Sequence, residues 1–204
     1  ASAGVDGLVV TAPFYIQPGQ DEIIAHFRAV QDAVSLPIIA YDIPSAVHTK
    51  LERSTVVRLA EEGIIVGLKD SSGDEANFRG VVAAFTGSEL LVDAAVAIGA
   101  RGSVPGLGNV DPAGYVRLYD AARRGDWDTA RTEQDRLYRL FSIIEPGLGR
   151  MGFTASAIGG FKTALMLRGV IATNVLARPM PRYNAEEIEQ VRRVLVDTGL
   201  LSAN

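Results

Sequence analysis

The sequence predicts an α/β fold built around a parallel sheet, and three observations support this prediction. Short apolar runs alternate with stretches that carry apolar residues at helical spacing. The connections between them are short, which favours parallel strands joined by right-handed crossovers. Reactive side chains stand at the carboxyl ends of the apolar runs, where sites form in such sheets. Five strand and helix units cannot close an eight-stranded barrel, so the sheet is either open or the later part of a barrel whose first three strands are absent.

The elements follow in a regular order along the chain. Apolar runs predict strands over residues 8–12, 37–44 and 64–69, and the helical patterns between them cover residues 21–34 and 54–62. The remaining predicted elements are an amphipathic segment over 75–82, strands at 84–86 and 102–105 around a helix at 90–98, and helices at 112–124, 127–144, 159–168 and 185–200.

Composition excludes several classes of function. A net charge of −4 with scattered arginines gives no basic patch, so we expect no nucleic-acid partner. With no cysteine and two separated histidines, His26 and His48, we expect neither a thiol nucleophile nor a metal site. The absence of a long apolar run and of a signal region predicts a cytoplasmic protein without membrane contact. The sequence enters a strand at once without an initiator Met, so we expect an N-terminal part to be missing.

Lys69 is the most unusual residue of this pattern, because it stands near the end of the apolar run that begins at Ile64. A strand buried on both faces carries few polar side chains, and desolvation disfavours the charged form of an amine. A neutral lysine can attack a ketone and form a Schiff base that withdraws electrons from the adjacent carbon. The alternative is that the stem of Lys69 covers apolar surface while its ammonium reaches water.

Tyr41 ends the preceding predicted strand. Schiff-base chemistry needs a group that moves protons to and from the reacting atoms. Neighbouring strands lie roughly 5 Å apart, so the hydroxyl of Tyr41 is placed to serve a substrate bound to Lys69. The alternative for an isolated tyrosine is a boundary aromatic with its hydroxyl in water.

These two residues belong to a longer pattern. Tyr41-Asp42-Ile43-Pro44, followed after a helix by residues 67–74 (GLKDSSGD), resembles the dihydrodipicolinate synthase and N-acetylneuraminate lyase family of pyruvate-dependent class I aldolases. The usual forms in that family are Y-N-x-P and G-x-K-[DE]-x-[ST]-G-[DN]. Residues 11–15, 87–89 and 99–104 match further motifs in the same order.

The resemblance covers essentially the whole chain and implies a (β/α)₈ TIM barrel, of which strands 4 to 8 and the C-terminal helices are present. Residues 1–110 would then carry the later barrel units and the active site. Residues 111–204 would form the last barrel helix and a helical extension of the same domain.

The resemblance also implies a role for each matching residue. Lys69 would form the Schiff base with pyruvate or another 2-oxo acid, and Tyr41 would relay protons. Tyr15 would complete the relay of a neighbouring subunit across a dimer interface, in a homo-oligomer that is usually a dimer of dimers. The expected partners are a 2-oxo acid and an aldehyde, with no cofactor. The implied substrate-binding residues are Thr11, Gly87, Ser88, Glu89 and Val104, the last through its backbone.

Two departures from the family pattern affect the expected reaction. The family's G-T-T-G-E carboxylate-binding loop, which belongs to an early strand, has no counterpart in this sequence. Synthase members carry Y-N-x-P-S-R-T-G, whose arginine grips the carboxylate of the aldehyde, whereas this chain has Ala46 at that place. His48 would substitute for the arginine in part, or is a solvated turn residue.

We therefore expect a lyase that cleaves or forms a 2-keto-3-deoxy sugar acid type of substrate. The alternatives are a 4-hydroxy-tetrahydrodipicolinate synthase and a catalytically silent barrel that binds a 2-oxo acid.

Overall fold

The computed structural model describes residues 4–74 and 84–202, which divide into two compact units. The first unit comprises residues up to 88 together with 94–104, and the second comprises 89–93 and the chain from 105 onward. The predicted amphipathic segment 75–82 lies outside the described residues.

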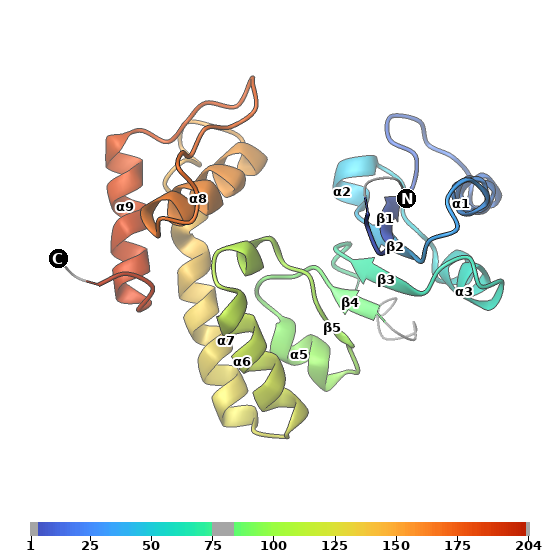
Figure 1. The fold of residues 1–204 in the computed structure, drawn as a ribbon, viewed down its shortest axis with the longest axis horizontal. Coiled ribbons are helices and arrows are strands. Elements are labelled where there is room, and N and C mark those ends of the chain that lie inside the picture. The colour runs from blue at the N-terminus through green and yellow to red at the C-terminus, as the bar shows by residue number, and fades with distance from the viewer. Residues whose placement is uncertain (1–3, 75–83, 203–204) are drawn as a thin grey trace. The chain divides into compact units, whose positions relative to one another are not determined.

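The first unit contains a five-stranded parallel sheet whose strands follow one another in sequence order (Figure 1). This order is what successive right-handed strand and helix units produce. All five predicted strands are therefore confirmed, with small changes at their ends. The strands are β1 (Leu8–Thr11), β2 (Ile38–Asp42), β3 (Gly67–Asp70), β4 (Ala84–Thr86) and β5 (Gly102–Ser103).

Helices α1 (Gln20–Ala33) and α3 (Arg53–Glu61) pack on one face of the sheet. Phe27 of α1 and Leu59 of α3 are fully buried against Ile38, Ala40 and Leu68 of the strands. Because side chains alternate between the two faces of a strand, their neighbours Tyr41 and Lys69 point to the opposite face. The helix-covered core thus fixes which side chains face the site.

The third strand begins three residues later than predicted, at Gly67. After α3, Gly63 adopts a φ of 70°, and the amides of Ile64 and Ile65 both donate to the carbonyl of Leu59, at 2.9 and 3.3 Å. These bonds satisfy the carbonyl of Leu59 in the last turn of the helix. The apolar run is therefore shared between a helix end and a strand, which apolarity alone does not distinguish.

Two short elements were not predicted. Helix α2 (Pro44–Val47) directly follows β2, and a 3₁₀ turn, η1 (Gly106–Asn109), follows β5. Helix α5 (Val92–Ala97) replaces the longer predicted helix 90–98.

The second unit is helical. Its helices α6 and α7 lie side by side (Figure 1). The predicted helix 159–168 begins six residues earlier, at Phe153, because Gly159 and Gly160 lie inside the helix. A Cβ on Gly160 would lie 2.3 Å from the carbonyl oxygen of Ile143, so the glycine permits a close approach of two backbones. The elements of this unit are α6 (Pro112–Arg123), α7 (Trp127–Phe141), η2 (Ser142–Ile144), α8 (Phe153–Leu167) and α9 (Ala185–Asp197).

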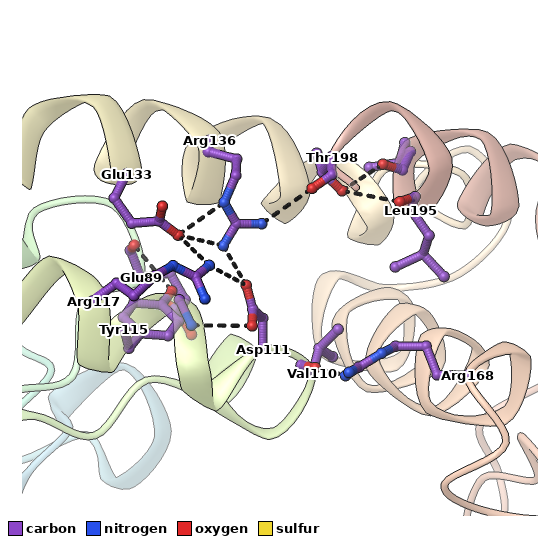
Figure 2. Close-up of polar contacts among 12 residues, drawn as sticks. Glu89, Val110, Asp111, Tyr115, Arg117, Glu133, Arg136, Arg168, Leu195 and Thr198 are labelled. Carbon is purple, nitrogen blue, oxygen red and sulfur yellow. Dashed lines mark hydrogen bonds and ion pairs between the residues drawn. The ribbon is translucent and has the colours of Figure 1, made fainter. Parts of the chain in front are cut away.

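A network of charged groups joins α6, α7 and the end of α9 (Figure 2). Asp111 is 3% exposed, caps α6 through the amide of Gly114 and binds the guanidinium of Arg136. Arg136 also donates to Glu133 and to the carbonyl of Thr198. Burial of Glu133 opposes its ionisation, but the hydrogen bonds from Arg136 and Arg117 prevail and lower its pKa below the ordinary value of 4.5. Glu133 therefore stays ionised at neutral pH.

Among residues 4–74 and 84–202, no helix combines the length and apolarity needed to cross a membrane. The same residues contain no group of three acidic, histidine or cysteine side chains arranged to hold a metal ion.

Candidate active site

The face of the sheet opposite α1 and α3 carries a row of side chains from four strands. In the parallel register, Thr11 pairs with Tyr41, Tyr41 with Lys69, and Lys69 with Phe85. The structure thus brings Thr11, Tyr41 and Lys69 together near the carboxyl ends of β1, β2 and β3, as the sequence predicts. Phe85 on the far side of Lys69 was not predicted, because only the register reveals its place in the row.

Lys69 and Tyr41 contact each other directly. The Lys69 Nζ lies 4.1 Å from the centroid of the Tyr41 ring, within the range of a cation–π interaction. Lys69 is half-buried, and no ion pair within the described part of the chain involves it. Within the described residues its nitrogen is therefore placed against an aromatic face and not against a carboxylate.

A second hydroxyl stands next to Tyr41. The Ser71 Oγ donates to the Tyr41 hydroxyl at 3.4 Å, and the Ser71 amide donates to the carbonyl of Asp42 at 2.9 Å. Ser71 was not singled out from the sequence, although it lies in the GLKDSSGD motif. Ser71 lies two residues beyond Lys69, so alternation along the chain puts both on the same face. This spacing could have indicated Ser71 as a site residue.

Gly87 provides the space that Ser71 occupies. A Cβ on Gly87 would lie 1.9 Å from the Ser71 Oγ, far inside contact distance. The amide of Gly87 also donates to the carbonyl of Asp70 at 2.7 Å, which fixes the approach of the two segments. Gly87 therefore lies next to Ser71, and it can do so because it has no side chain.

Ser88 and Val104 are organised by a buried residue that sequence reasoning missed. Thr86, 7% exposed, accepts a hydrogen bond from the Ser88 amide on its hydroxyl, at 3.1 Å. Its carbonyl accepts one from the Val104 amide at 2.8 Å. Thr86 thus joins the ends of β4 and β5.

Tyr15 and His48 lie in loops, and both adopt a positive φ, of 78° and 62° respectively. Tyr15 is 86% exposed and stands between the exposed Phe14 and Ile16. His48 is exposed and ends α2 with its amide bonded to the Pro44 carbonyl. Within the described residues neither side chain forms a hydrogen bond or ion pair with Lys69 or Tyr41.

Glu89 belongs to the second unit, where several groups hold it. Its carboxylate accepts from the Gly106 amide at 3.0 Å, and its carbonyl accepts from Tyr115 and Gln134, the Tyr115 contact being visible in Figure 2. Burial, together with the nearby Glu89 and Asp111, raises the pKa of Tyr115, so its hydroxyl remains a donor at neutral pH. The Glu89 backbone is thereby fixed.

A charged cluster lies at the ends of β2 and β3. Asp42, 1% exposed, accepts from the Lys50 Nζ at 2.5 Å and from the Leu51 amide at 3.1 Å. Burial raises the pKa of Asp42 above its ordinary value of 3.8, while the bonds from Lys50 and Leu51 oppose that rise. Asp70, the partner of Asp42 in the register, is 6% exposed, and its Oδ1 accepts from the Ser72 amide at 2.7 Å.

Comparison with known proteins identifies the family of this chain. Residues 1–198 match the model of the dihydrodipicolinate synthetase family. The chain belongs to this family. The dihydrodipicolinate synthetase family was the one indicated by the sequence motifs, so that prediction is confirmed.

Several members of the family are similar over nearly all of this chain. A 4-hydroxy-tetrahydrodipicolinate synthase of Corynebacterium aurimucosum is 35% identical over 206 residues, which cover 98% of this chain and 66% of that protein. An uncharacterized DapA-like lyase of Halobacterium salinarum is 33% identical over 98% of this chain and 65% of its own length. The solved structure of dihydrodipicolinate synthase from Bacteroides thetaiotaomicron matches with a TM-score of 0.87 at 28% identity, over 96% of this chain and 67% of that one.

These matches confirm the predicted barrel fold of the dihydrodipicolinate synthetase family for the five strands and their helices. The chain spans about two thirds of the length of the relatives that it matches. The division at residue 110 and the individual roles of the site residues stay predictions.

Proposed function

We propose that the protein is a Schiff-base-forming lyase or aldolase. It cleaves or forms a 2-oxo acid of the 2-keto-3-deoxy sugar acid type, and pyruvate is one component of the reaction. The observation that carries this proposal is the placement of the Lys69 amine against the Tyr41 ring in one row near the carboxyl ends of neighbouring strands. Family membership supports the same class of chemistry.

In this mechanism the Lys69 amine attacks the ketone carbon of the 2-oxo acid. The resulting carbinolamine loses water when Tyr41 delivers a proton to the departing oxygen, and a protonated imine remains. The aromatic face of Tyr41 stabilises the positive charge of that imine, since an aromatic ring attracts a cation placed over its face.

Tyr41, now deprotonated, takes the proton from the hydroxyl of the substrate as the bond beyond the neighbouring carbon breaks. The aldehyde leaves and an enamine remains, because the imine accepts the electron pair of the broken bond. The enamine takes up a proton on carbon, and hydrolysis of the imine releases pyruvate and regenerates the amine. Condensation is the same sequence in reverse. Ser71, 3.4 Å from the Tyr41 hydroxyl, extends the path along which the protons travel.

The proposed substrate preference rests on Ala46, which lies in the short helix that follows β2. Ala46 is exposed in α2 and offers no guanidinium to a carboxylated aldehyde, whereas an arginine fork binds a carboxylate bidentately. A second candidate function is 4-hydroxy-tetrahydrodipicolinate synthesis, which the names of the similar proteins favour.

We further propose that the protein is a homo-oligomer, a dimer of dimers, in which Tyr15 enters the site of a neighbouring subunit. The exposure of Tyr15 between two other exposed apolar side chains supports a contact outside its own subunit. An exposed aromatic group flanked by apolar residues is typical of a protein interface.

The test is to treat the native protein with pyruvate and borohydride and to measure its intact mass and peptide map. We expect one reduced pyruvate on the peptide that contains Lys69, and loss of both the adduct and turnover in Lys69→Ala. Lys162→Ala is the matched control, because the Lys162 ammonium is bonded to the carbonyl of Val175 in the second unit. An unmodified wild-type protein that still binds pyruvate would instead support a silent 2-oxo-acid-binding barrel.

The substrate class is tested by turnover. Cleavage of 2-keto-3-deoxy sugar acids is expected to exceed condensation of pyruvate with a carboxylated aldehyde. The reverse preference would replace the proposed substrate by that of the synthase.

A further inference from the structure

Lys50 connects the residue after Tyr41 to the loop after Lys69. Its ammonium lies 2.5 Å from the Asp42 Oδ2 and 2.7 Å from the Ser72 Oγ, and it also pairs with Asp74 at 3.9 Å. The carbonyl of Lys50 accepts from the side chain of Gln20 in α1, which holds the backbone of this lysine from the other side. Lys50 therefore joins the end of β2 to the loop after β3 through its side chain, and contacts α1 through its backbone.

The charge of Lys50 is needed where it lies. Asp42 is almost completely buried, and a buried carboxylate without a partner is strongly unfavourable. The register also places Asp70 beside Asp42, and the Oδ2 of Asp70 is buried with no hydrogen-bond partner among residues 4–74 and 84–202. The lysine is thus the cation that offsets the buried carboxylate of Asp42.

The same contacts hold Ser72, the residue that follows Ser71. Ser71 is flanked by Asp70 and Ser72, and Ser72 is held by Lys50 through its hydroxyl and by Asp70 through its amide. The hydrogen bond from Ser71 to Tyr41, at 3.4 Å, is already longer than the roughly 3.0 Å at which most bonds between two hydroxyl groups end. A displacement of a few tenths of an ångström in this loop would break it.

We propose that Lys50 is a positioning residue for the site: through Asp42 and Ser72 it fixes the loop that keeps Ser71 beside Tyr41. This inference rests on the proposed function, since the geometry it protects is that of the proton relay. Lys50 itself does not contact the reacting atoms. Its effect on the rate arises because misplacement of a catalytic group by about 1 Å costs up to roughly 100-fold in rate.

Three variants of the native protein test the proposal. Lys50→Met removes the ammonium and keeps the length of the stem. Asp42→Asn combined with Lys50→Met removes both charges, so that no buried carboxylate at this position is left unpaired. Arg28→Met is the control, because it breaks an exposed ion pair with Glu62 in the same unit.

Hydrogen–deuterium exchange of the peptide that covers residues 70–74 reports the position of the loop, and kinetics report its consequence. In Lys50→Met we expect faster exchange of this peptide and a fall in kcat of about 10- to 100-fold. Borohydride trapping of Lys69 at saturating pyruvate should still go to completion. In the double variant we expect stability to recover towards wild type while kcat stays low, because the tie to Ser72 is still absent.

Wild-type exchange and kcat in Lys50→Met would overturn the proposal, as would recovery of wild-type kcat in the double variant, which would show that only the unpaired charge had mattered. The failure of the proposed function has a different signature, namely a wild-type protein that borohydride and pyruvate leave unmodified. In that case hydrogen–deuterium exchange alone tests the positioning role of Lys50. Unchanged exchange of residues 70–74 in Lys50→Met would still refute it.

Discussion

Gly87 and Ser71 approach each other so closely that a Cβ on Gly87 would lie 1.9 Å from the Ser71 Oγ. The same serine is hydrogen-bonded to the Tyr41 hydroxyl. A side chain at position 87 must therefore move Ser71, and the movement reaches Tyr41. The glycine at the end of β4 controls the arrangement of two hydroxyl groups on neighbouring strands.

Gly87→Ala is accordingly expected to lower kcat by about 10- to 100-fold, because the displaced hydroxyl no longer meets Tyr41. Combining it with Ser71→Gly should remove the clash and restore stability but not activity. Gly149→Ala is the control, since nothing lies within 4 Å of a Cβ at that position. Steady-state kinetics and urea unfolding of the three proteins measure both effects. Full activity in Gly87→Ala would show that the position of Ser71 does not matter to the reaction.

The pairing of Glu187 with Arg150 predicts a specific dependence of stability on pH. Hydrogen bonds from Arg150 lower the pKa of Glu187 below its ordinary value of 4.5. A carboxylate with a lowered folded-state pKa contributes stability that is fully present above the unfolded pKa and is lost as the pH falls through the folded pKa. The free energy of unfolding of Glu187→Gln should therefore be below that of wild type at neutral pH.

The difference between the two proteins should shrink as the pH falls below 4.5, since Glu187 then becomes protonated in both the unfolded and the folded state. Urea unfolding at a series of pH values measures it. Glu186→Gln, exposed in the same helical turn, is expected to change little. A difference between wild type and Glu187→Gln that is independent of pH would contradict the ion-pair account.

The core beneath the site is the most sensitive part of the first unit. Phe27 is fully buried between α1 and the sheet, so Phe27→Ala removes a large side chain that nothing replaces. We expect a loss of about 3–5 kcal/mol in the free energy of unfolding, measured by urea denaturation. Phe153→Ala deletes the same side chain at a position 63% exposed and should cost far less. Equal losses would mean that Phe27 does not pack as the structure has it.

Much of this fold could be predicted from the sequence, because the signal is local. The apolar runs that become β1 and β2 each end at a polar residue, Thr11 and Asp42. Lys69 stands out because it is the one amine in the apolar run that begins at Ile64. The motifs around it then indicated the family. Alternation of side chains along a strand is sufficient to place Tyr41 and Lys69 on the same face once the register is known.

What could not be predicted depends on contacts between segments far apart in the sequence. Phe85 lies beside Lys69 because of the register of β3 and β4. Ser71 has room for its hydroxyl because the residue opposite it is Gly87. The sequence around Lys50 does not indicate a role, because an isolated lysine in a loop is ordinarily solvated. The proposed role of Lys50 depends on the burial of Asp42 and on the bond between the two side chains, which only the folded structure shows.

The exposure of Tyr15 leads to a prediction about subunit cooperation. If Tyr15 completes the site of a neighbouring subunit, Tyr15→Phe and Lys69→Ala should each be nearly inactive alone. A mixed dimer would contain one intact site, made from the Lys69 of the first chain and the Tyr15 of the second. Mixing equal amounts and allowing the subunits to exchange should therefore restore about a quarter of the wild-type sites, because half of the random dimers are mixed and each has one intact site of two.

The control is a single chain that carries both substitutions, mixed with wild type. In those mixed dimers, one site lacks Lys69 and the other lacks the Tyr15 of its neighbour, so the mixed dimers should contribute no activity. Turnover per subunit, measured before and after exchange, distinguishes the two experiments. If the two single variants fail to complement each other although mixed dimers form, Tyr15 does not act across an interface, and its exposed ring must serve its own subunit or none.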